Sequence, residues 1–209
     1  MMRIDSVASQ PDRAGRHTVR FDDGTVLRLY RQTVQDFGLF TGQELSDPEF
    51  QRLREAAGEM SAKMRAVRIV SASNVSKRDL EQRLIRKGED PEQAKQAVQW
   101  MSDLELLDDQ KTACQIVDGC IRKGYGLARA KQALYEKKIP KEYWDEALAD
   151  YPAQTEKIMD FLRTRLGQEW NDRDLRRATD ALIRRGHSYS EIRQALQQLS
   201  LETDLMEDL

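Results

Sequence analysis

Two different spacings of hydrophobic residues divide the chain. The segments HTVRF (17–21) and VLRLY (26–30) alternate polar and apolar residues, which is the period of a β-strand. The sequence DDGT between them is typical of a hairpin turn, and RIDSV (3–7) can add a third strand. From residue 46 almost to the end, apolar residues instead recur every three or four positions, as along one face of a helix. We therefore expect a mainly α protein with a small N-terminal β-hairpin.

The first long helix is expected to begin near residue 46, where SDPEFQRLREAA (46–57) starts. Pro48 suits a first helical turn, because the missing N–H of proline has no partner there in any case. Either Asp47 or Ser46 is expected to cap this helix, since both side chains can accept a hydrogen bond from a free backbone N–H.

An internal repeat organises the helical part of the chain. Residues 76–98 align without a gap with residues 126–148, at an offset of 50, and these align with residues 174–196, at an offset of 48. Each unit consists of a helix, a short turn that begins with basic residues, and a second helix. One leucine of the first helix falls at the same position in every unit and is expected to be buried: Leu84, Leu134 and Leu182.

A further helical stretch precedes each unit, at residues 59–73, 108–124 and 153–167. The repeat is therefore a three-helix unit of about fifty residues, whose short helices need burial against their neighbours to be stable. The predicted organisation is an N-terminal extension (1–46), three helical repeats (47–106, 107–152 and 153–200) and an acidic tail (201–209).

The sequence RKGYG (122–126) allows two interpretations. Its two glycines beside basic residues could form a loop that binds phosphate, or they could separate two packed helices. A phosphate loop needs a strand before it, and DGCIRK instead has a helical pattern. We therefore expect Gly124 to end one helix, where glycine tolerates a left-handed turn, and Gly126 to lie just before the next.

Other candidate chemistry is sparse. Asp108 or Asp109 is expected to cap a helix, since a catalytic carboxylate pair has no supporting nucleophile or base here. Cys114 and Cys120 lie on different faces of one predicted helix, too far apart for a disulfide, and are expected to be small buried residues. The only histidines, His17 and His187, lack the spacing of metal ligands. We expect no metal, no cofactor and no enzymatic activity.

The tryptophans also have structural interpretations. Trp100 and Trp144 lie on apolar helical faces and are expected in the core. Trp170 precedes a helix start and could pack against its first turn.

Composition and charge refine this picture. The chain of 209 residues is 39% hydrophobic and 33% charged, which favours thin helical layers over one thick core. Residues 49–200 contain 28 Lys and Arg against 25 Asp and Glu, whereas the last nine residues contain four acids and no base. That acidic tail is either a solvated end or a competitor for a basic binding face. No apolar run is long enough to span a bilayer, and the start has no signal-peptide pattern, so a cytoplasmic location is expected.

Several motifs together resemble the RecX family, the bacterial regulators of RecA recombinase. They are VSKRDLEQRLIRKG (75–88), LLDD (106–109), KGYG (123–126), AKQAL (130–134) and KKIPKEYWDEAL (137–148). The resemblance covers about residues 60–200, and the N-terminal hairpin is similar to the extension of longer members. Two positions depart from the family pattern, since Lys138 stands where a glycine is usual and Thr112 where an aromatic residue is common.

The resemblance implies an elongated, curved array of three-helix repeats without enzymatic activity. It implies a monomer that binds the RecA–DNA filament, represses strand exchange and ATP hydrolysis, and has weak, non-specific affinity for single- and double-stranded DNA. A helical adaptor that binds another protein without nucleic-acid contact is the alternative.

Basic residues recur at matching places in the repeats, and we expect them to form a partner- and DNA-binding face. Each one taken singly could equally complement the dipole at a helix C-terminus. The candidate residues are Arg83, Arg86, Lys87, Arg122, Lys123, Lys131, Lys137, Lys138, Arg184 and Arg185.

Overall fold

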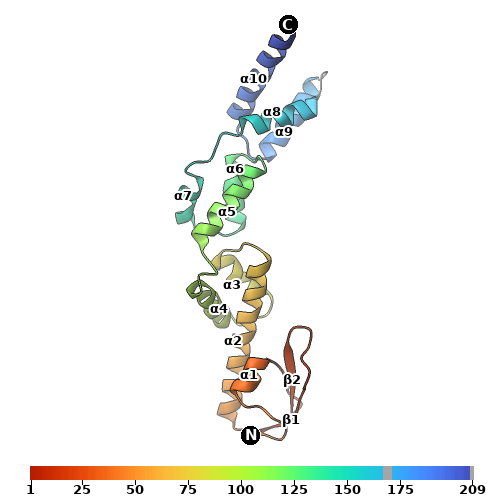
Figure 1. Ribbon diagram of the computed structural model, residues 1–209, viewed down its shortest axis with the longest axis vertical. Helices are drawn as coiled ribbons and strands as arrows, with labels where there is room; N and C mark the ends of the chain where they lie inside the picture. The colour runs from red at the N-terminus through yellow and green to blue at the C-terminus, as the bar shows by residue number, and fades with distance from the viewer. Residues whose placement is uncertain (167–170, 208–209) are drawn as a thin grey trace. The chain divides into compact units, whose positions relative to one another are not determined.

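The structure, a computed structural model, describes residues 1–166 and 171–207 (Figure 1). It divides into two compact units, Met1–Leu107 and the part that begins at Asp108. The chain is mainly helical, as the sequence predicts. Trp170 and the end of the acidic tail lie outside the described residues.

The N-terminal extension forms a four-stranded antiparallel sheet, which is larger than the predicted hairpin. The hairpin of β2 (Arg16–Phe21) and β3 (Val26–Tyr30) is present, with Arg20 opposite Val26 beside the turn, and RIDSV forms the third strand by pairing with β2. The fourth strand contains two residues, too few to show an alternating pattern in the sequence. The strand order is β3-β2-β1-β4, and the elements are β1 (Met2–Val7), β2 (Arg16–Phe21), β3 (Val26–Tyr30), α1 (Arg31–Asp36) and β4 (Glu44–Leu45).

A single 26-residue helix, α2 (Asp47–Ala72), follows the sheet. Ser46 is its cap, and the Ser46 backbone N–H and hydroxyl both donate to the Glu49 carboxylate in a capping box. This helix joins two stretches that have separate helical patterns in the sequence, residues 46–57 and 59–73. Only Ser46 and Ser73, the caps at its two ends, lie outside it. Figure 1 shows α2 running from the sheet into the first helical repeat.

Helix α2 contributes to two hydrophobic cores. Near its start, Leu53 is fully buried with Ile4 and Phe21 of the sheet, and the Phe21 and Phe50 rings meet edge to face with centroids 5.1 Å apart. Further along, Ala62 and Ala66 are fully buried in the core of the first repeat. The sheet and the first repeat are therefore packed on the same helix.

The first repeat continues with two shorter helices. Ser76 and Asp90 cap them by accepting backbone N–H bonds, and Leu84 of the first is buried in the core that both form with α2. Trp100 is partly buried against this core, as expected. The helices are α3 (Lys77–Arg86) and α4 (Pro91–Asp103).

The second unit contains the other two repeats, each with its own hydrophobic core. Leu134 and Leu182 are 0% and 1% exposed, and Leu84 of the first unit is also 0% exposed, so all three leucines are buried as predicted. Trp144 is partly buried and donates its indole N–H to the Ile139 carbonyl at 3.0 Å. The helices are α5 (Asp109–Arg122), α6 (Leu127–Glu136), η1 (Lys141–Tyr143), α7 (Trp144–Leu148), α8 (Thr155–Leu166), α9 (Asp172–Arg184) and α10 (Tyr189–Glu207).

Two elements differ from a uniform repeat. The last helix of the middle repeat, α7, has five residues, whereas the matching α4 has 13, and Pro152 closely follows its end. At the C-terminus, α10 continues to Glu207, so the backbone of the acidic tail is helical up to that residue.

The predicted roles of the glycine pair and the caps are confirmed. Gly124 follows α5 with a φ of +64°, and Gly126 is the N-cap of α6, so RKGYG separates two helices. Asp108 caps α5 by accepting the Lys111 backbone N–H. Cys114 and Cys120 are free thiols; Cys120 is buried as expected, and Cys114 is half-buried.

Membrane-spanning helices and clusters of metal ligands are both absent from the described residues. No helix among them is long and apolar enough to cross a membrane. No group of three or more His, Cys, Asp or Glu side chains in the described part of the chain could hold a metal ion.

Candidate nucleic-acid interface

In the second unit, the middle and last repeats meet through their backbones at two glycines. The Gly126 N–H donates to the Arg185 carbonyl at 2.9 Å, and the Ala128 N–H donates to the Gly186 carbonyl at 3.3 Å. A Cβ atom on Gly126 would lie 2.1 Å from the Gly186 oxygen, closer than any real contact, so only glycine fits there without a shift. We call these contacts the repeat 2–3 junction. It fixes Arg185 beside the Tyr125 segment.

A buried histidine reinforces the repeat 2–3 junction. The His187 side chain is 4% exposed, and its Nε2 lies 3.1 Å from the Gly124 carbonyl oxygen. Because a carbonyl only accepts, Nε2 carries the proton and donates in the neutral ring. Burial lowers the pKa of His187, which favours this neutral form. The Tyr151 hydroxyl adds a bond to the Tyr125 carbonyl, and burial raises the pKa of Tyr151 to about 12.

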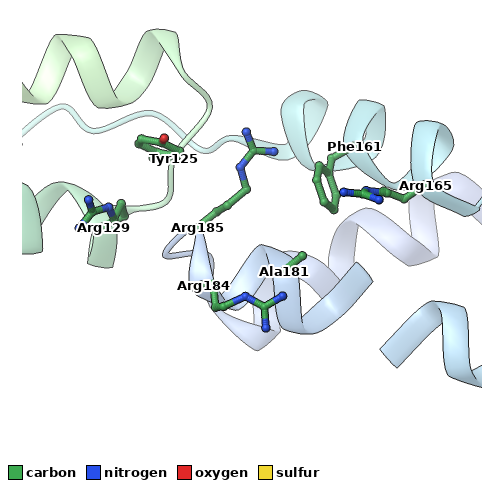
Figure 2. A pocket seen from close by; sticks show the side chains of 7 residues that line it. All are labelled: Tyr125, Arg129, Phe161, Arg165, Ala181, Arg184 and Arg185. Atoms are coloured by element: carbon green, nitrogen blue, oxygen red, sulfur yellow. The ribbon is translucent and has the colours of Figure 1, made fainter. Parts of the chain in front are cut away.

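An arginine-rich groove lies beside this junction. We call it the repeat 2–3 groove; it has a volume of about 440 Å³, and its charged and aromatic lining residues are Tyr125, Arg129, Phe161, Arg165, Arg184 and Arg185. Figure 2 shows the Arg185 side chain between the two aromatic rings. The guanidinium carbon of Arg185 lies 5.8 Å from the centre of the Tyr125 ring and 5.1 Å from the centre of the Phe161 ring. The guanidinium carbon of Arg165 lies 5.8 Å from the centre of the Phe161 ring.

The repeat 2–3 groove has an excess of positive charge. Arg129 forms an ion pair with Glu136 at 3.0 Å, and the hydrogen bonds from Arg129 and Gln132 lower the pKa of that carboxyl. Within the described part of the chain, no ion pair is found for Arg165, Arg184 or Arg185, and no Asp or Glu lines the groove. Three guanidinium groups are therefore available to an anionic ligand.

A second basic groove lies in the first unit, where the sheet meets α2 and α3. We call it the sheet–helix groove; it has a volume of about 470 Å³, and its charged and aromatic lining residues are Arg16, Tyr30, Arg65, Arg68, Arg83 and Lys87. Both units thus contain a groove that combines several cations with at least one aromatic ring.

The ten predicted basic residues lie mostly at helix C-termini. Arg83 and Lys87 line the sheet–helix groove, and Arg184 and Arg185 line the repeat 2–3 groove. The other six line neither groove. Arg86 and Arg122 are in last turns, Lys123 and Lys137 are C-caps, Lys138 follows α6, and Lys131 is exposed on α6.

Sequence reasoning missed the remaining cations of both grooves. Arg65 and Arg68 of α2 have Gln115 and Asp118 at the matching positions of the next repeat, so a search for recurrent charges passes over them. Arg16 lies on a strand, outside the repeats. The adjacent Arg184 and Arg185 were visible in the sequence, but the aromatic partners of Arg185, Tyr125 and Phe161, come from other parts of the chain.

Comparison with known proteins places this architecture in one family. The family profile described as RecX, second three-helix domain, matches residues 108–148. The regulatory protein RecX of Xanthomonas axonopodis pv. citri (strain 306) is 30% identical over 141 residues, which cover 66% of this chain and 86% of that protein. The regulatory protein RecX of Clostridium acetobutylicum is 21% identical over 210 residues, which cover 96% of this chain and 98% of that protein.

Solved structures agree with the fold. The crystal structure of a regulatory protein RecX superposes with a TM-score of 0.63 at 19% identity and covers 94% of this chain and all of that one. The crystal structure of RecX from Lactobacillus salivarius gives a TM-score of 0.59 at 21% identity and covers 70% of this chain and 99% of that one. With these similarities in sequence and in fold, this chain belongs to the RecX family, whose members are regulatory proteins and not enzymes.

Proposed function

We propose that this protein binds the filament that RecA recombinase forms on DNA and represses its strand exchange and ATP hydrolysis. Membership of the RecX family supports a regulatory role in recombination and DNA repair. The protein acts as a monomer in the cytoplasm, and its own affinity for single- and double-stranded DNA is weak and independent of sequence.

The repeat 2–3 groove is the observation that carries this proposal. A RecA–DNA filament presents phosphate and acidic protein surface, so its ligand needs guanidinium groups that no carboxylate neutralises. Among the described residues, no carboxylate forms an ion pair with Arg165, Arg184 or Arg185, and their fork of N–H donors matches the oxygens of a phosphate or carboxylate. The backbone bonds of the repeat 2–3 junction hold Arg185 in place before binding, which lowers the entropy lost on association.

The first experiment measures ATP hydrolysis by preformed RecA filaments. Substoichiometric addition of this protein should slow hydrolysis if one bound molecule acts on several RecA subunits. Strand exchange should slow in parallel. Unchanged rates at equal molarity would contradict the proposal.

A matched pair of variants tests the repeat 2–3 groove. Changing Arg165 and Arg184 to Glu places two carboxylates in the groove, and both side chains are exposed, so the fold should survive. We expect the concentration needed for half-maximal repression to rise at least tenfold, because like charges then face each other. The control changes Arg173 and Arg193 to Glu. These exposed residues of the same repeat lie outside the groove and make the same change in net charge.

The recurrent cations at helix ends need a separate variant. Changing Arg86, Lys87, Lys137 and Lys138 to Glu should leave a helical protein by circular dichroism, at a cost of about 0.3 to 1 kcal/mol for each acid near a helix C-terminus. If these residues contact the filament, that protein no longer represses hydrolysis. Wild-type repression by the folded variant would move the contact to another face.

A further inference from the structure

We propose that the sheet–helix groove is a second binding site, completed by the N-terminal sheet, for the phosphate backbone and a base of single-stranded nucleic acid. This inference rests on the proposed function in that both assume a nucleic-acid partner. It adds a site that works without RecA and gives the N-terminal sheet a role.

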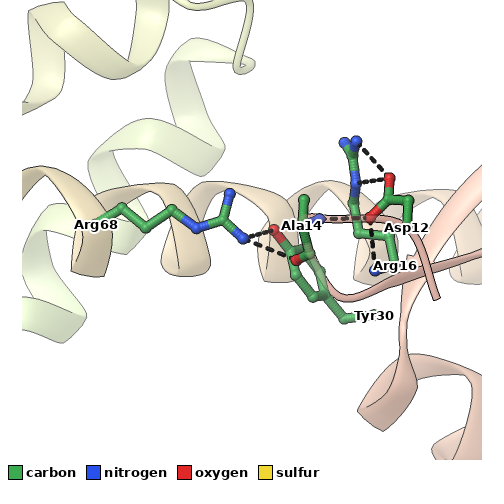
Figure 3. A network of polar contacts seen from close by, with 5 residues as sticks. All are labelled: Asp12, Ala14, Arg16, Tyr30 and Arg68. Atoms are coloured by element: carbon green, nitrogen blue, oxygen red, sulfur yellow. Dashed lines mark hydrogen bonds and ion pairs between the residues drawn. The ribbon is translucent and has the colours of Figure 1, made fainter.

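The sheet is held over α2 by a long side chain as well as by its core. Figure 3 shows Arg68 of α2 reaching the β1–β2 loop and β3. Its Nη2 donates to the Ala14 carbonyl at 2.8 Å and to the Tyr30 hydroxyl at 3.4 Å. The Phe50 and Leu53 side chains of the same helix pack in the core of the sheet. The sheet, which forms one wall of the groove, is therefore fixed relative to α2, which forms the other.

Five cations from three elements line this groove. Arg16 lies on β2, Arg65 and Arg68 on α2, and Arg83 and Lys87 at the end of α3. Among the described residues, no Asp or Glu lines the groove, and no carboxylate lies within ion-pair distance of Arg68 or Lys87. The sequence places these residues up to 71 positions apart, from 16 to 87, and only the fold gathers them.

Three carboxylates orient the arginines. Asp12 pairs with Arg16 at 2.8 Å, Glu89 with Arg65 at 2.7 Å, and Asp79 with Arg83 at 2.8 Å. Glu89 and Asp79 are buried, with side chains 7% and 6% exposed, whereas their arginine partners are 33% and 31% exposed. Three carboxylates against five cations leave a local excess of two positive charges.

The oriented cations and the tyrosine ring of this groove suit the phosphate backbone of a nucleic acid better than a single small anion. Guanidinium groups that are already oriented lose little entropy when they bind phosphate oxygens. The half-buried Tyr30 lies among them and offers a ring on which a base can stack. A series of cations beside an aromatic side chain is the combination by which proteins bind single strands without reading their sequence.

The test measures binding of the full chain to a fluorescein-labelled single-stranded 30-nucleotide DNA, without RecA, by fluorescence anisotropy at several salt concentrations. In the variant with Arg68→Glu and Lys87→Glu, we expect at least a tenfold loss of affinity in low salt. The slope of log affinity against log salt should flatten by about 1.4, since each single-strand phosphate contact contributes about 0.7. The control, Arg52→Glu with Arg54→Glu, changes two exposed residues of α2 outside the groove and should keep the wild-type slope.

Single variants keep the test valid if loss of Arg68 loosens the sheet. Lys87→Glu alone leaves the Arg68 contacts intact and should flatten the slope by about 0.7. Tyr30→Leu removes the ring and should weaken binding at least fivefold, whereas Tyr30→Phe keeps the ring and loses only the 3.4 Å bond, so it should bind nearly as the wild type. Wild-type affinity and slope in the folded Lys87→Glu protein would overturn the proposal.

Two further outcomes separate this site from the alternatives. If a polyglutamate peptide displaces the DNA as well as unlabelled DNA does, and loses its affinity in the same variants, the groove binds acidic protein and the proposal is wrong. Repression of RecA is measured independently. If the wild-type protein represses ATP hydrolysis but the groove variants bind DNA normally, only the proposed DNA site is wrong. If the wild-type protein binds DNA through the groove but does not repress RecA, only the proposed function is wrong.

Discussion

The two units of this protein hold their parts together in different ways. In the first, the sheet and the first repeat are packed on one continuous helix, and the Arg68 side chain adds polar contacts. In the second, the two repeats meet through backbone hydrogen bonds that only glycine allows. A core on a shared helix can adapt to a changed side chain, whereas a close backbone contact is sensitive to a single added carbon.

The largest expected effect comes from the equivalent core leucines. Changing Leu84, Leu134 or Leu182 to Ala should each lower the free energy of unfolding by about 2 to 5 kcal/mol, because all three are buried and a cavity is left. If the repeat 2–3 junction couples its repeats, either Leu134→Ala or Leu182→Ala should speed amide hydrogen exchange in both of them. A change below about 1 kcal/mol in all three variants would mean that the repeat alignment is wrong.

The next effect isolates the glycine contact. Gly186 and Gly88 lie at matching positions with φ of +88° and +90°, so alanine costs a similar conformational strain, about 1 to 2 kcal/mol, at either site. A Cβ on Gly186 would also lie 2.3 Å from the Arg129 backbone nitrogen, whereas nothing lies within 4 Å at Gly88. Gly186→Ala should therefore cost about 1 to 3 kcal/mol more than Gly88→Ala in chemical denaturation. Equal losses would remove the contrast between the units.

A smaller effect uses Lys138, which stands where the other two repeats have these glycines. Its φ is +56°, in the left-handed region that costs a non-glycine residue about 1 to 2 kcal/mol. Glycine removes this strain, but it also makes the unfolded chain more flexible, which offsets part of the gain in stability. Lys138→Gly should stabilise the second unit by up to about 1 kcal/mol in thermal or chemical unfolding. The reverse change, Gly88→Lys, should destabilise the first unit by a similar amount. If Lys138→Gly instead lowers stability, the contacts of the Lys138 side chain contribute more to stability than its backbone strain costs.

The smallest effect is a dependence on pH at the repeat 2–3 junction. Burial lowers the pKa of His187, so the unfolded chain takes up a proton more readily than the folded chain does. The stabilisation is complete above the usual histidine pKa of about 6.5 and is lost as the pH falls below it. Protonation would also give Nδ1 a hydrogen with no acceptor among the described residues. Melting temperatures from pH 7.5 to 5.5 should fall more steeply in the wild type than in His187→Gln, and parallel curves would exclude this histidine.

Local patterns in the sequence predicted most of the architecture. The burial of Leu84, Leu134 and Leu182 was predicted from the internal repeat, and the role of the glycines in RKGYG from a few neighbouring residues; the structure confirms both. The strand β4 was missed because two residues show no period, and the shortness of α7 was missed because the sequence before it still has a helical pattern.

The two grooves were only partly predictable. Arg184 and Arg185 were identified because basic residues recur at helix ends, a rule that local sequence expresses. Arg68 and Tyr30 were not, because they come together only when the sheet, with Tyr30 at the end of β3, packs against α2. Such a combination depends on tertiary packing, and a single sequence contains no periodic signal for it.

The helix shared by the sheet and the first repeat has a practical consequence for shortened versions of the protein. A cut at residue 46 looks safe in the sequence, because it falls where strands give way to helices. In the folded chain, however, it removes the partners of Leu53 and Phe50 and leaves an apolar stripe on the first half of α2 facing water. A shortened protein that begins there should aggregate or self-associate, and replacing Phe50 and Leu53 with polar residues should restore its solubility.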